Sequence, residues 1–286
     1  MTIEKIDNIS PKDFYENFVK KGVPAILKNA SQSWKDNSIF TPEFFATNFG
    51  SRVTTFNGRE YTMTEILEIT KNSTRENPAP YPIQYEIPIQ LPELMDAIHP
   101  IHLNYSRPNW FRSKLLPYGK IGNSIHLFIG GQGNSYGIHK DIYHTNAWIT
   151  QLYGQKDFIL FPRDQEHLLY PESTSTDMKN CGSPIDILNP DFERYPLFKH
   201  ATPTWVTAEQ GETMFIPNGM WHTTAAHAQN ISLIYDQLNS SNFKAWSKDM
   251  YNYAVPNSKK KAVINYSFAM IMGNGMRFLE LLGAKF

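Results

Sequence analysis

The stretch HLFIGGQGNSYGIHKD, residues 126–141, decides the fold and contains the first candidate site. An apolar run rich in strand-forming residues is followed by the turn GGQG and then by His139-Lys140-Asp141. Side chains two residues apart on a β-strand point to the same face. His139 and Asp141 therefore point to one place, and Lys140 points away. We expect a strand, a turn and a second strand that ends in part of a metal site.

Similar short runs recur through the middle of the chain, separated by turns that contain Gly, Pro and Asn. They read IHLFIG, AWITQLYG, DFILFP, PTWVTA, TMFIP and ISLIYDQL. Regularly spaced short strands predict a mainly β fold, a sandwich or barrel of jelly-roll type. Residues 165–203 interrupt this pattern with polar and turn-forming residues, and we expect them to form a long surface excursion that faces a partner or serves the function.

The first hundred residues alternate helix and strand signals. Residues 10–22 and 41–50 each begin with a hydroxyl residue followed by proline and end at glycine, which predicts two capped helices. Asn57-Gly58 predicts a hairpin turn, and residues 62–70 predict a third helix. Residues 75–93 contain five prolines, so we expect a wrapping segment and no core element.

The end of the chain is predicted to be helical. FKAWSKDMYNYA, residues 243–254, suits one helix, and residues 260–286 suit a second that is weakened at Gly273-Asn274-Gly275. The second helix is too apolar to lie alone in water. It packs either on its own domain or against a second copy of the chain, and a homodimer through these helices is therefore one expectation.

We expect one catalytic domain over residues 1–240, followed by a C-terminal helical extension over 241–286. Within that domain, residues 1–100 form an α/β elaboration, and residues 101–240 form the jelly-roll core. The length of 286 residues fits one domain with an appendage.

The composition excludes several classes of protein. Lys and Arg together number 27, as do Asp and Glu, and a neutral net charge argues against nucleic acid as a partner. Cys181 is the only cysteine, which excludes an internal disulfide and a cysteine-based zinc site. The first residues lack the pattern of a secretory signal, and no apolar run is long enough to span a membrane. We expect a cytoplasmic protein that does not bind membranes.

The HxD pair supplies two ligands of a 2-His-1-carboxylate triad, which needs a distant second histidine. His222 ends GETMFIPNGMWH, where a turn, a buried strand and another turn would place its ring at the mouth of a barrel. His227 is a weaker candidate because it has the opposite strand parity to His222. His144 follows Asp141 by three residues, so we expect a neighbour of the site and not a ligand.

Four segments carry a resemblance to a known family. They are residues 126–141 quoted above, QLYGQKDFILFPRDQEHLLYP at 151–171, NPDFERYPLF at 189–198 and GETMFIPNGMWH at 211–222. Together they resemble the JmjC family of Fe(II)/2-oxoglutarate oxygenases. The resemblance is greatest to its cupin-like hydroxylase branch, which includes the asparaginyl hydroxylase that inhibits hypoxia-inducible factor. It implies a double-stranded β-helix core, flanked here by the predicted helices.

The resemblance also assigns roles to individual residues. His139, Asp141 and His222 would bind iron(II), and Lys156 would pair with the distal carboxylate of 2-oxoglutarate. Tyr136 stands where the family often has an assisting hydroxyl. Asn146 is the candidate for an asparagine near 2-oxoglutarate, although this chain has about two extra residues just before it. The implied cofactors are Fe(II), 2-oxoglutarate and O2.

The implied reaction inserts oxygen into a C–H bond of a protein or peptide side chain and releases succinate and CO2. The same chemistry on a small molecule, such as a sugar, a lipid head group or an amino acid, stays an alternative, as does a metal-binding cupin that is no oxygenase. Hydroxylation is favoured over lysine demethylation because no cysteine-rich zinc module accompanies the core. Trp148, Trp221 and Tyr153 either wall the pocket or simply fill the core.

Overall fold

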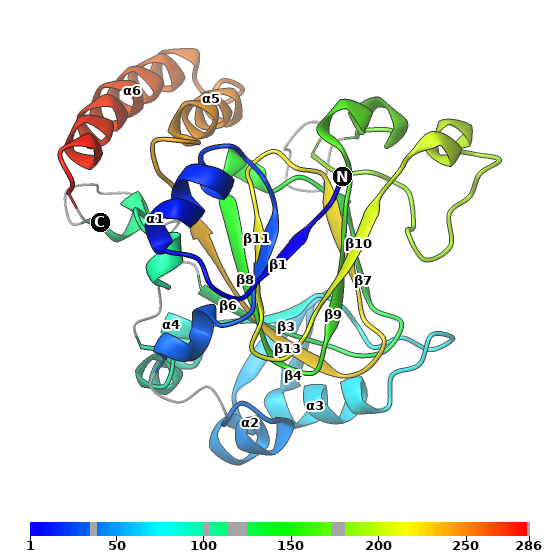
Figure 1. The fold of residues 1–286 in the computed structure, drawn as a ribbon. Helices are drawn as coiled ribbons and strands as arrows, with labels where there is room; N and C mark the ends of the chain where they lie inside the picture. The colour runs from blue at the N-terminus through cyan, green and yellow to red at the C-terminus, as the bar shows by residue number, and fades with distance from the viewer. Residues whose placement is uncertain (35–38, 100–102, 114–124, 173–180, 285–286) are drawn as a thin grey trace.

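Two facing β-sheets form the body of the protein in the computed structural model, which describes residues 1–34, 39–99, 103–113, 125–172 and 181–284 (Figure 1). The larger sheet has seven strands. In order across the sheet they are β1 (Glu4–Ile6), β2 (Ala25–Leu27), β11 (Thr213–Ile216), β8 (Asn146–Tyr153), β13 (Asn230–Gln237), β6 (Ile125–Gly130) and β5 (Ile83–Glu86).

The smaller sheet has four antiparallel strands: β10 (Thr204–Ala208), β9 (Lys156–Leu160), β12 (His222–Ala225) and β7 (Ser135–His139). Consecutive strands alternate between the sheets, as β6 and β7 do and again β8 and β9. Gly154 makes the second crossing with φ +67°, and a Cβ atom there would lie 2.5 Å from the carbonyl oxygen of Gln229. This arrangement confirms the predicted mainly β jelly roll.

Helices pack around the sheets where their caps predict them. Ser10, Thr41 and Thr62 each accept a backbone N–H three residues later. The three caps start α1 (Pro11–Phe14), α2 (Pro42–Phe49) and α3 (Met63–Lys71), respectively. Helix α1 continues as a π-helical turn (Tyr15–Val19). The hairpin at Asn57-Gly58 joins β3 (Val53–Phe56) to β4 (Arg59–Thr62).

The expectation that residues 75–93 contribute nothing to the core is wrong. β5 pairs with β6 and forms an edge of the large sheet, followed by the short helix α4 (Ile87–Gln90). Ile83, Tyr85 and Ile87 are almost completely buried in the main core. An edge strand tolerates flanking prolines because one of its sides donates no ladder hydrogen bonds. The number of prolines in residues 75–93 was therefore a misleading signal, because an edge strand can lie between them.

The C-terminal extension consists of two packed helices, α5 (Phe243–Ala254) and α6 (Lys259–Leu281), which lie together at one end of the molecule (Figure 1). α6 runs without interruption through Gly273, so the predicted weakening there is not seen. A Cβ atom on Gly273 would lie 2.3 Å from the ring of Phe243. Glycine is thus needed at this position because the two helices approach closely.

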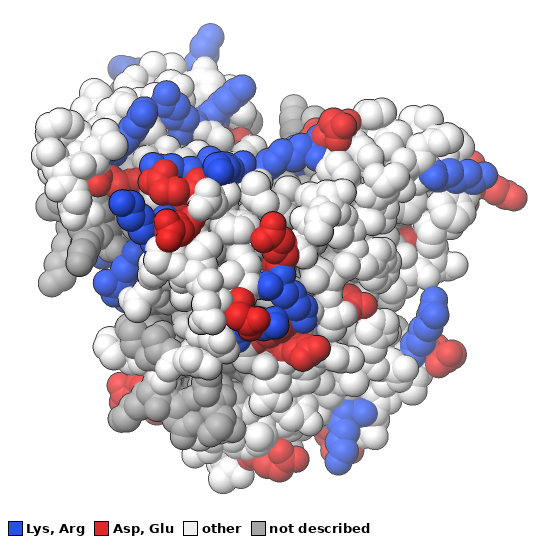
Figure 2. Space-filling model, viewed as in Figure 1, with Lys and Arg blue, Asp and Glu red and all other residues white. Residues whose placement is uncertain are grey.

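The 165–203 excursion is only partly a surface loop, and residues 173–180 within it lie outside the described part. Leu169, Ile185 and Phe198 are buried against the small sheet. Ser183 donates its backbone N–H to the carbonyl oxygen of Ile138 at 2.9 Å, so the excursion pairs with the edge of β7. On the face shown in Figure 2, basic and acidic side chains are interspersed. None of the described helices is long and apolar enough to cross a bilayer.

Candidate metal centre and adjoining pocket

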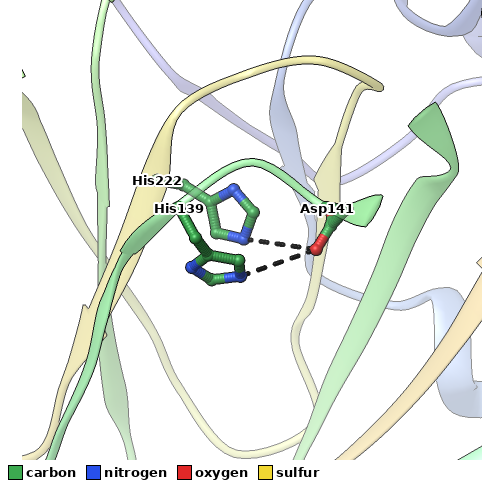
Figure 3. A group of neighbouring side chains, drawn as sticks. All are labelled: His139, Asp141 and His222. Atoms are coloured by element: carbon green, nitrogen blue, oxygen red, sulfur yellow. Dashed lines mark ion pairs between the residues drawn. The ribbon is translucent and has the colours of Figure 1, made fainter. Parts of the chain in front are cut away.

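The three predicted ligands lie together at one end of the small sheet. His139 is the last residue of β7, His222 is the first of β12, and the two are direct partners in the strand pairing. Asp141 follows two residues after β7 ends. Its Oδ1 atom lies 3.6 Å from Nε2 of His139 and 3.8 Å from Nε2 of His222 (Figure 3). One donor atom from each residue lies within 4.8 Å of the other two, so a single ion between them could contact all three.

Backbone carbonyl groups fix the orientation of both imidazoles. Nδ1 of His139 lies 2.8 Å from the carbonyl oxygen of Gly137, and Nδ1 of His222 lies 3.0 Å from that of Met220. A carbonyl oxygen only accepts, so each Nδ1 must carry the proton and donate it. The lone pair of each neutral ring is therefore on Nε2, the atom that faces Asp141. Such outer hydrogen bonds are what hold histidine ligands ready for a metal.

The protonation states also suit a metal. Burial, together with the neighbouring His139, lowers the pKa of His222 to about 4, so its ring is neutral near pH 7. Burial alone would raise the pKa of Asp141, but the adjacent histidines outweigh it and the net direction is downward. Two imidazoles and one carboxylate form the donor set that non-haem iron(II) sites use, with the remaining positions open.

A cavity of about 130 Å³ extends from these ligands into the space between the two sheets. Tyr81 closes one side of it. The small sheet contributes Tyr136, His139, Lys156, Phe158, His222 and Thr224, and the large sheet contributes Phe128, Ala147, Ile149, Ile234 and Asp236. The cavity thus has polar side chains on one wall and mostly apolar side chains on the other.

Lys156 is a buried cation in this cavity, with only 3% of its surface exposed. Nζ donates to Oγ of Ser232 at 2.9 Å and lies 3.5 Å from the hydroxyl of Tyr81. Within the described ranges it forms no ion pair, and burial lowers its pKa to about 7. An ammonium group without a counter-ion is costly in such surroundings. The cavity that contains the three clustered donors therefore also offers an anion a charged partner.

Of the two further residues predicted at the cosubstrate, Tyr136 lines the cavity and Asn146 does not. The ring centroid of Tyr136 lies 4.6 Å from that of His139. Asn146 faces away: it donates to Gln237 at 3.1 Å and accepts from the backbone N–H of Asn218 at 2.8 Å. Its neighbour Ala147 takes the inward position, because side chains alternate along β8.

Among the residues that line the cavity, the sequence did not identify three polar ones. Tyr81 comes from the proline-rich segment that we expected to wrap the surface, and Thr224 lies two residues after His222 on β12. Asp236 faces the cavity from β13, where its Oδ1 accepts the hydroxyl of Thr145 at 3.0 Å. Burial, with the nearby Asp141, raises its pKa to about 7. The parity of the run ISLIYDQL was the only available signal for Asp236.

Lys140, His227 and His144 lie outside the cluster of three donors. Lys140 points away from the ligands, 3.0 Å from Glu166 and over the ring of Trp221. His227 lies outside the cluster and pairs with Asp157 at 2.7 Å. His144 is not one of the clustered ligands, and its Nδ1 lies 2.5 Å from Asp249.

The aromatic residues near the motifs fill the core. Trp148 is fully buried on the outer side of the large sheet, where its ring is tilted against that of Phe215 with 4.9 Å between centroids. Trp221 is buried in the cluster under the 165–203 excursion, and Tyr153 packs on the main core. None of the three is among the residues that line the cavity.

Comparison with known proteins identifies the family. A model of the cupin-like domain matches residues 39–241. The chain is 26% identical over 284 residues to "Arginine-specific demethylase JMJ20" of Arabidopsis thaliana, covering 87% of this chain and 59% of that protein. It is 23% identical over 252 residues to "Arginine-specific demethylase JMJ22" of the same plant, covering 84% of this chain and 47% of the relative.

A third relative, human "HSPB1-associated protein 1", is 34% identical over 104 residues, which are 36% of this chain and 21% of that protein. The chain therefore spans less than two thirds of the length of these curated relatives. The resemblance to the asparaginyl hydroxylase branch stays a prediction. Because the cupin-like model covers most of the jelly roll and all three clustered ligands, this chain belongs to the cupin-like domain family, of the JmjC type.

Proposed function

We propose that the protein is an Fe(II)- and 2-oxoglutarate-dependent hydroxylase that acts on a side chain of a protein or peptide. One observation carries the proposal: a triad of donors and a buried lysine that forms no ion pair among the described residues line the same small cavity. A dicarboxylate with a keto acid at one end fits both requirements, because one end can chelate the metal while the other neutralises the lysine.

In this proposal each residue has a distinct task. His139, Asp141 and His222 hold the metal on one side and leave its other positions free. Lys156 binds the distal carboxylate of the cosubstrate. The negative charge of that carboxylate stabilises the protonated form of the lysine side chain. When bound, iron(II) and 2-oxoglutarate supply the activation of O2 that puts one oxygen atom into a C–H bond and the other into succinate.

The walls of the cavity serve the reaction by excluding water and fixing orientation. Phe128, Ile149, Phe158 and Ile234 line it with apolar surface. Gln151 accepts the hydroxyl of Ser232 at 2.8 Å, and Ser232 in turn accepts from Lys156. This chain of hydrogen bonds holds the ammonium group at a fixed point, which positions the cosubstrate relative to the metal.

The substrate class rests on the relatives. Two of them are named arginine-specific demethylases, and an N-methyl group carries C–H bonds of the kind that this chemistry attacks. We therefore favour a protein side chain, with or without a methyl group, over a small molecule. A metal-binding cupin without oxygenase activity is a further alternative. The next experiment distinguishes it from the proposed oxygenase.

The test is an anaerobic titration of the full chain with Fe(II) and then 2-oxoglutarate. We expect a weak visible charge-transfer band and, after air is admitted, succinate. Asp141→Ala should abolish both, whereas Asp7→Ala, which alters an exposed ion pair with Lys28, should leave both unchanged. Absence of the band and of succinate would reject the oxygenase. Mass spectrometry of a treated cell extract would then locate products that have gained one oxygen atom.

We also propose that α6 mediates a homodimer. Its exposed side chains include Ile264, Phe268, Ile271, Phe278 and Leu281, of which Ile271 is 72% exposed. A row of this size on one helix is typical of a protein interface. Replacing Phe268 and Ile271 with lysine should give a monomer in light scattering without loss of folding. A wild-type protein that is already monomeric at micromolar concentration would contradict the proposal.

A further inference from the structure

The turn Ile142–His144, which connects the ligand Asp141 to β8, has an unusual backbone. Tyr143 and His144 have φ values of 60° and 49°, in the left-handed region that residues other than glycine rarely adopt. Two such residues in succession persist only where the surroundings determine their conformation, and such places cluster at functional sites. The question is which part of the molecule holds this turn.

Helix α5 of the C-terminal extension and the residue before it contact the turn Ile142–His144 in three places. Oδ2 of Asp249 lies 2.5 Å from Nδ1 of His144, and both side chains are largely buried. Nδ2 of Asn242, the residue before α5, donates to the carbonyl oxygen of His144 at 3.0 Å. The ring of Tyr253 meets that of Tyr143 edge-on, with 6.0 Å between centroids. One helix thus contacts both strained residues.

The other side of the His144 ring reaches the second ligand-bearing segment. Gly219, three residues before His222, packs so closely that a Cβ atom there would lie 3.2 Å from Cδ2 of His144. Nearby, Asn146 accepts the backbone N–H of Asn218 at 2.8 Å. The turn after Asp141 and the turn before His222 are therefore in contact at His144, and α5 contacts the first of them.

Helix α5 packs on α6, which is in turn held by side chains from other parts of the chain. Glu280 of α6 accepts the indole N–H of Trp110 at 2.9 Å and the hydroxyl of Tyr15 from the N-terminal helix. Gly273 lets α6 pack directly on Phe243 at the start of α5. The position of α5 is therefore also determined by contacts that do not involve the turn Ile142–His144.

We infer that Asp249 is a positioning residue for the metal ligands. It acts through His144 to keep Asp141 and His222 at the separation that one ion requires, and the C-terminal extension is thereby part of the metal site. This inference rests on the proposed function in one respect, namely that the triad binds a metal. It does not depend on which substrate is oxidised.

The test is binding of Mn(II) to the metal-free full chain, followed by electron paramagnetic resonance of the free ion. Asp249→Asn keeps the size of the side chain and removes its charge, and we expect about tenfold weaker binding, equivalent to about 1.4 kcal/mol. Lys248→Gln, at the exposed neighbouring position on α5, is the matched control and should bind as the wild type does. Thermal melting of each variant reports its folding separately.

A second substitution separates positioning from general support of the fold. Glycine adopts a positive φ without strain, so Tyr143→Gly in the Asp249→Asn background should restore Mn(II) affinity to within about threefold of wild type. If Asp249→Asn weakens Mn(II) binding and Tyr143→Gly does not restore it, Asp249 does not act on the ligands through the turn Ile142–His144, and the inference is overturned. Wild-type affinity in Asp249→Asn would overturn the inference but leave the triad intact, whereas a wild-type protein that binds no Mn(II) would overturn the triad as well.

Discussion

The two walls of the cavity differ in chemistry although both are β-sheet. The four-stranded sheet carries the two histidines of the candidate metal site and the buried lysine, whereas the seven-stranded sheet contributes apolar side chains and a single carboxyl group, Asp236. His139 and His222 are partners in one strand ladder, so backbone hydrogen bonds set their separation. The comparison teaches that strand pairing fixes the relative positions of two of the three clustered side chains, whereas the third, Asp141, lies beyond the end of β7 and depends on the turn that follows it.

The strongest way to break this comparison is to damage the seven-stranded sheet. Trp148 is fully buried on its outer side against Phe14 and Phe215. Trp148→Ala should cost about 3–5 kcal/mol of unfolding free energy, measured in urea, because it leaves a large cavity. The folded fraction should keep its Mn(II) affinity, since the histidine ligands belong to the other sheet. Loss of metal binding while the protein is still folded would refute the division of roles.

A substitution in the four-stranded sheet should have the opposite signature. Lys156→Met should weaken 2-oxoglutarate binding about 100-fold, or about 2.7 kcal/mol, as measured by calorimetry. It should also raise the free energy of unfolding, because a buried cation that lacks a counter-ion is replaced by an apolar chain. Lys28→Met, at an exposed ion pair, is the control and should change neither quantity appreciably. A destabilised variant with intact binding would contradict the assignment.

Asp236 sharpens the comparison because it is the exception on the apolar wall. Its pKa is raised to about 7, so the folded protein binds this proton more tightly than the unfolded chain does. The stabilisation is present in full below about pH 4 and is lost as the pH rises through 7. Asp236→Asn should therefore stabilise the metal-free protein by about 2 kcal/mol at pH 8 and have little effect at pH 4. Equal effects at both pH values in thermal melting would show that the carboxyl group is already ionised.

Local signals in the sequence predicted much of this molecule. Ser10 and Thr41 cap helices because their hydroxyl groups reach the free N–H groups of the first turn, which depends on adjacent residues alone. The alternation along residues 126–141 predicted correctly that His139 and Asp141 share a face. Even the turn at Asn57-Gly58 follows from the tolerance of those two residues for a positive φ.

Errors arose where distant segments decided the outcome. Residues 75–93 have the composition of a loop, yet Ile83 and Tyr85 enter the core because the edge of β6 was available for pairing. The prediction that Asn146 faces the cavity was one residue out of register, since Ala147 takes that position. On a strand, a shift of one residue reverses the face to which a side chain points. The two strained residues after Asp141 could not be foreseen, since neither is glycine and α5 lies about a hundred residues later.

The sequence by itself determined the kind of fold and the three side chains that cluster as candidate metal ligands, because strand periodicity and ligand type are properties of short segments. Only the tertiary structure decided that Asp236 and Tyr81 face the cavity, that Asn146 does not, and that α5 holds the turn after Asp141. These features depend on the register between strands and on helix docking. Both are set by the packing of the whole chain, which no local pattern encodes.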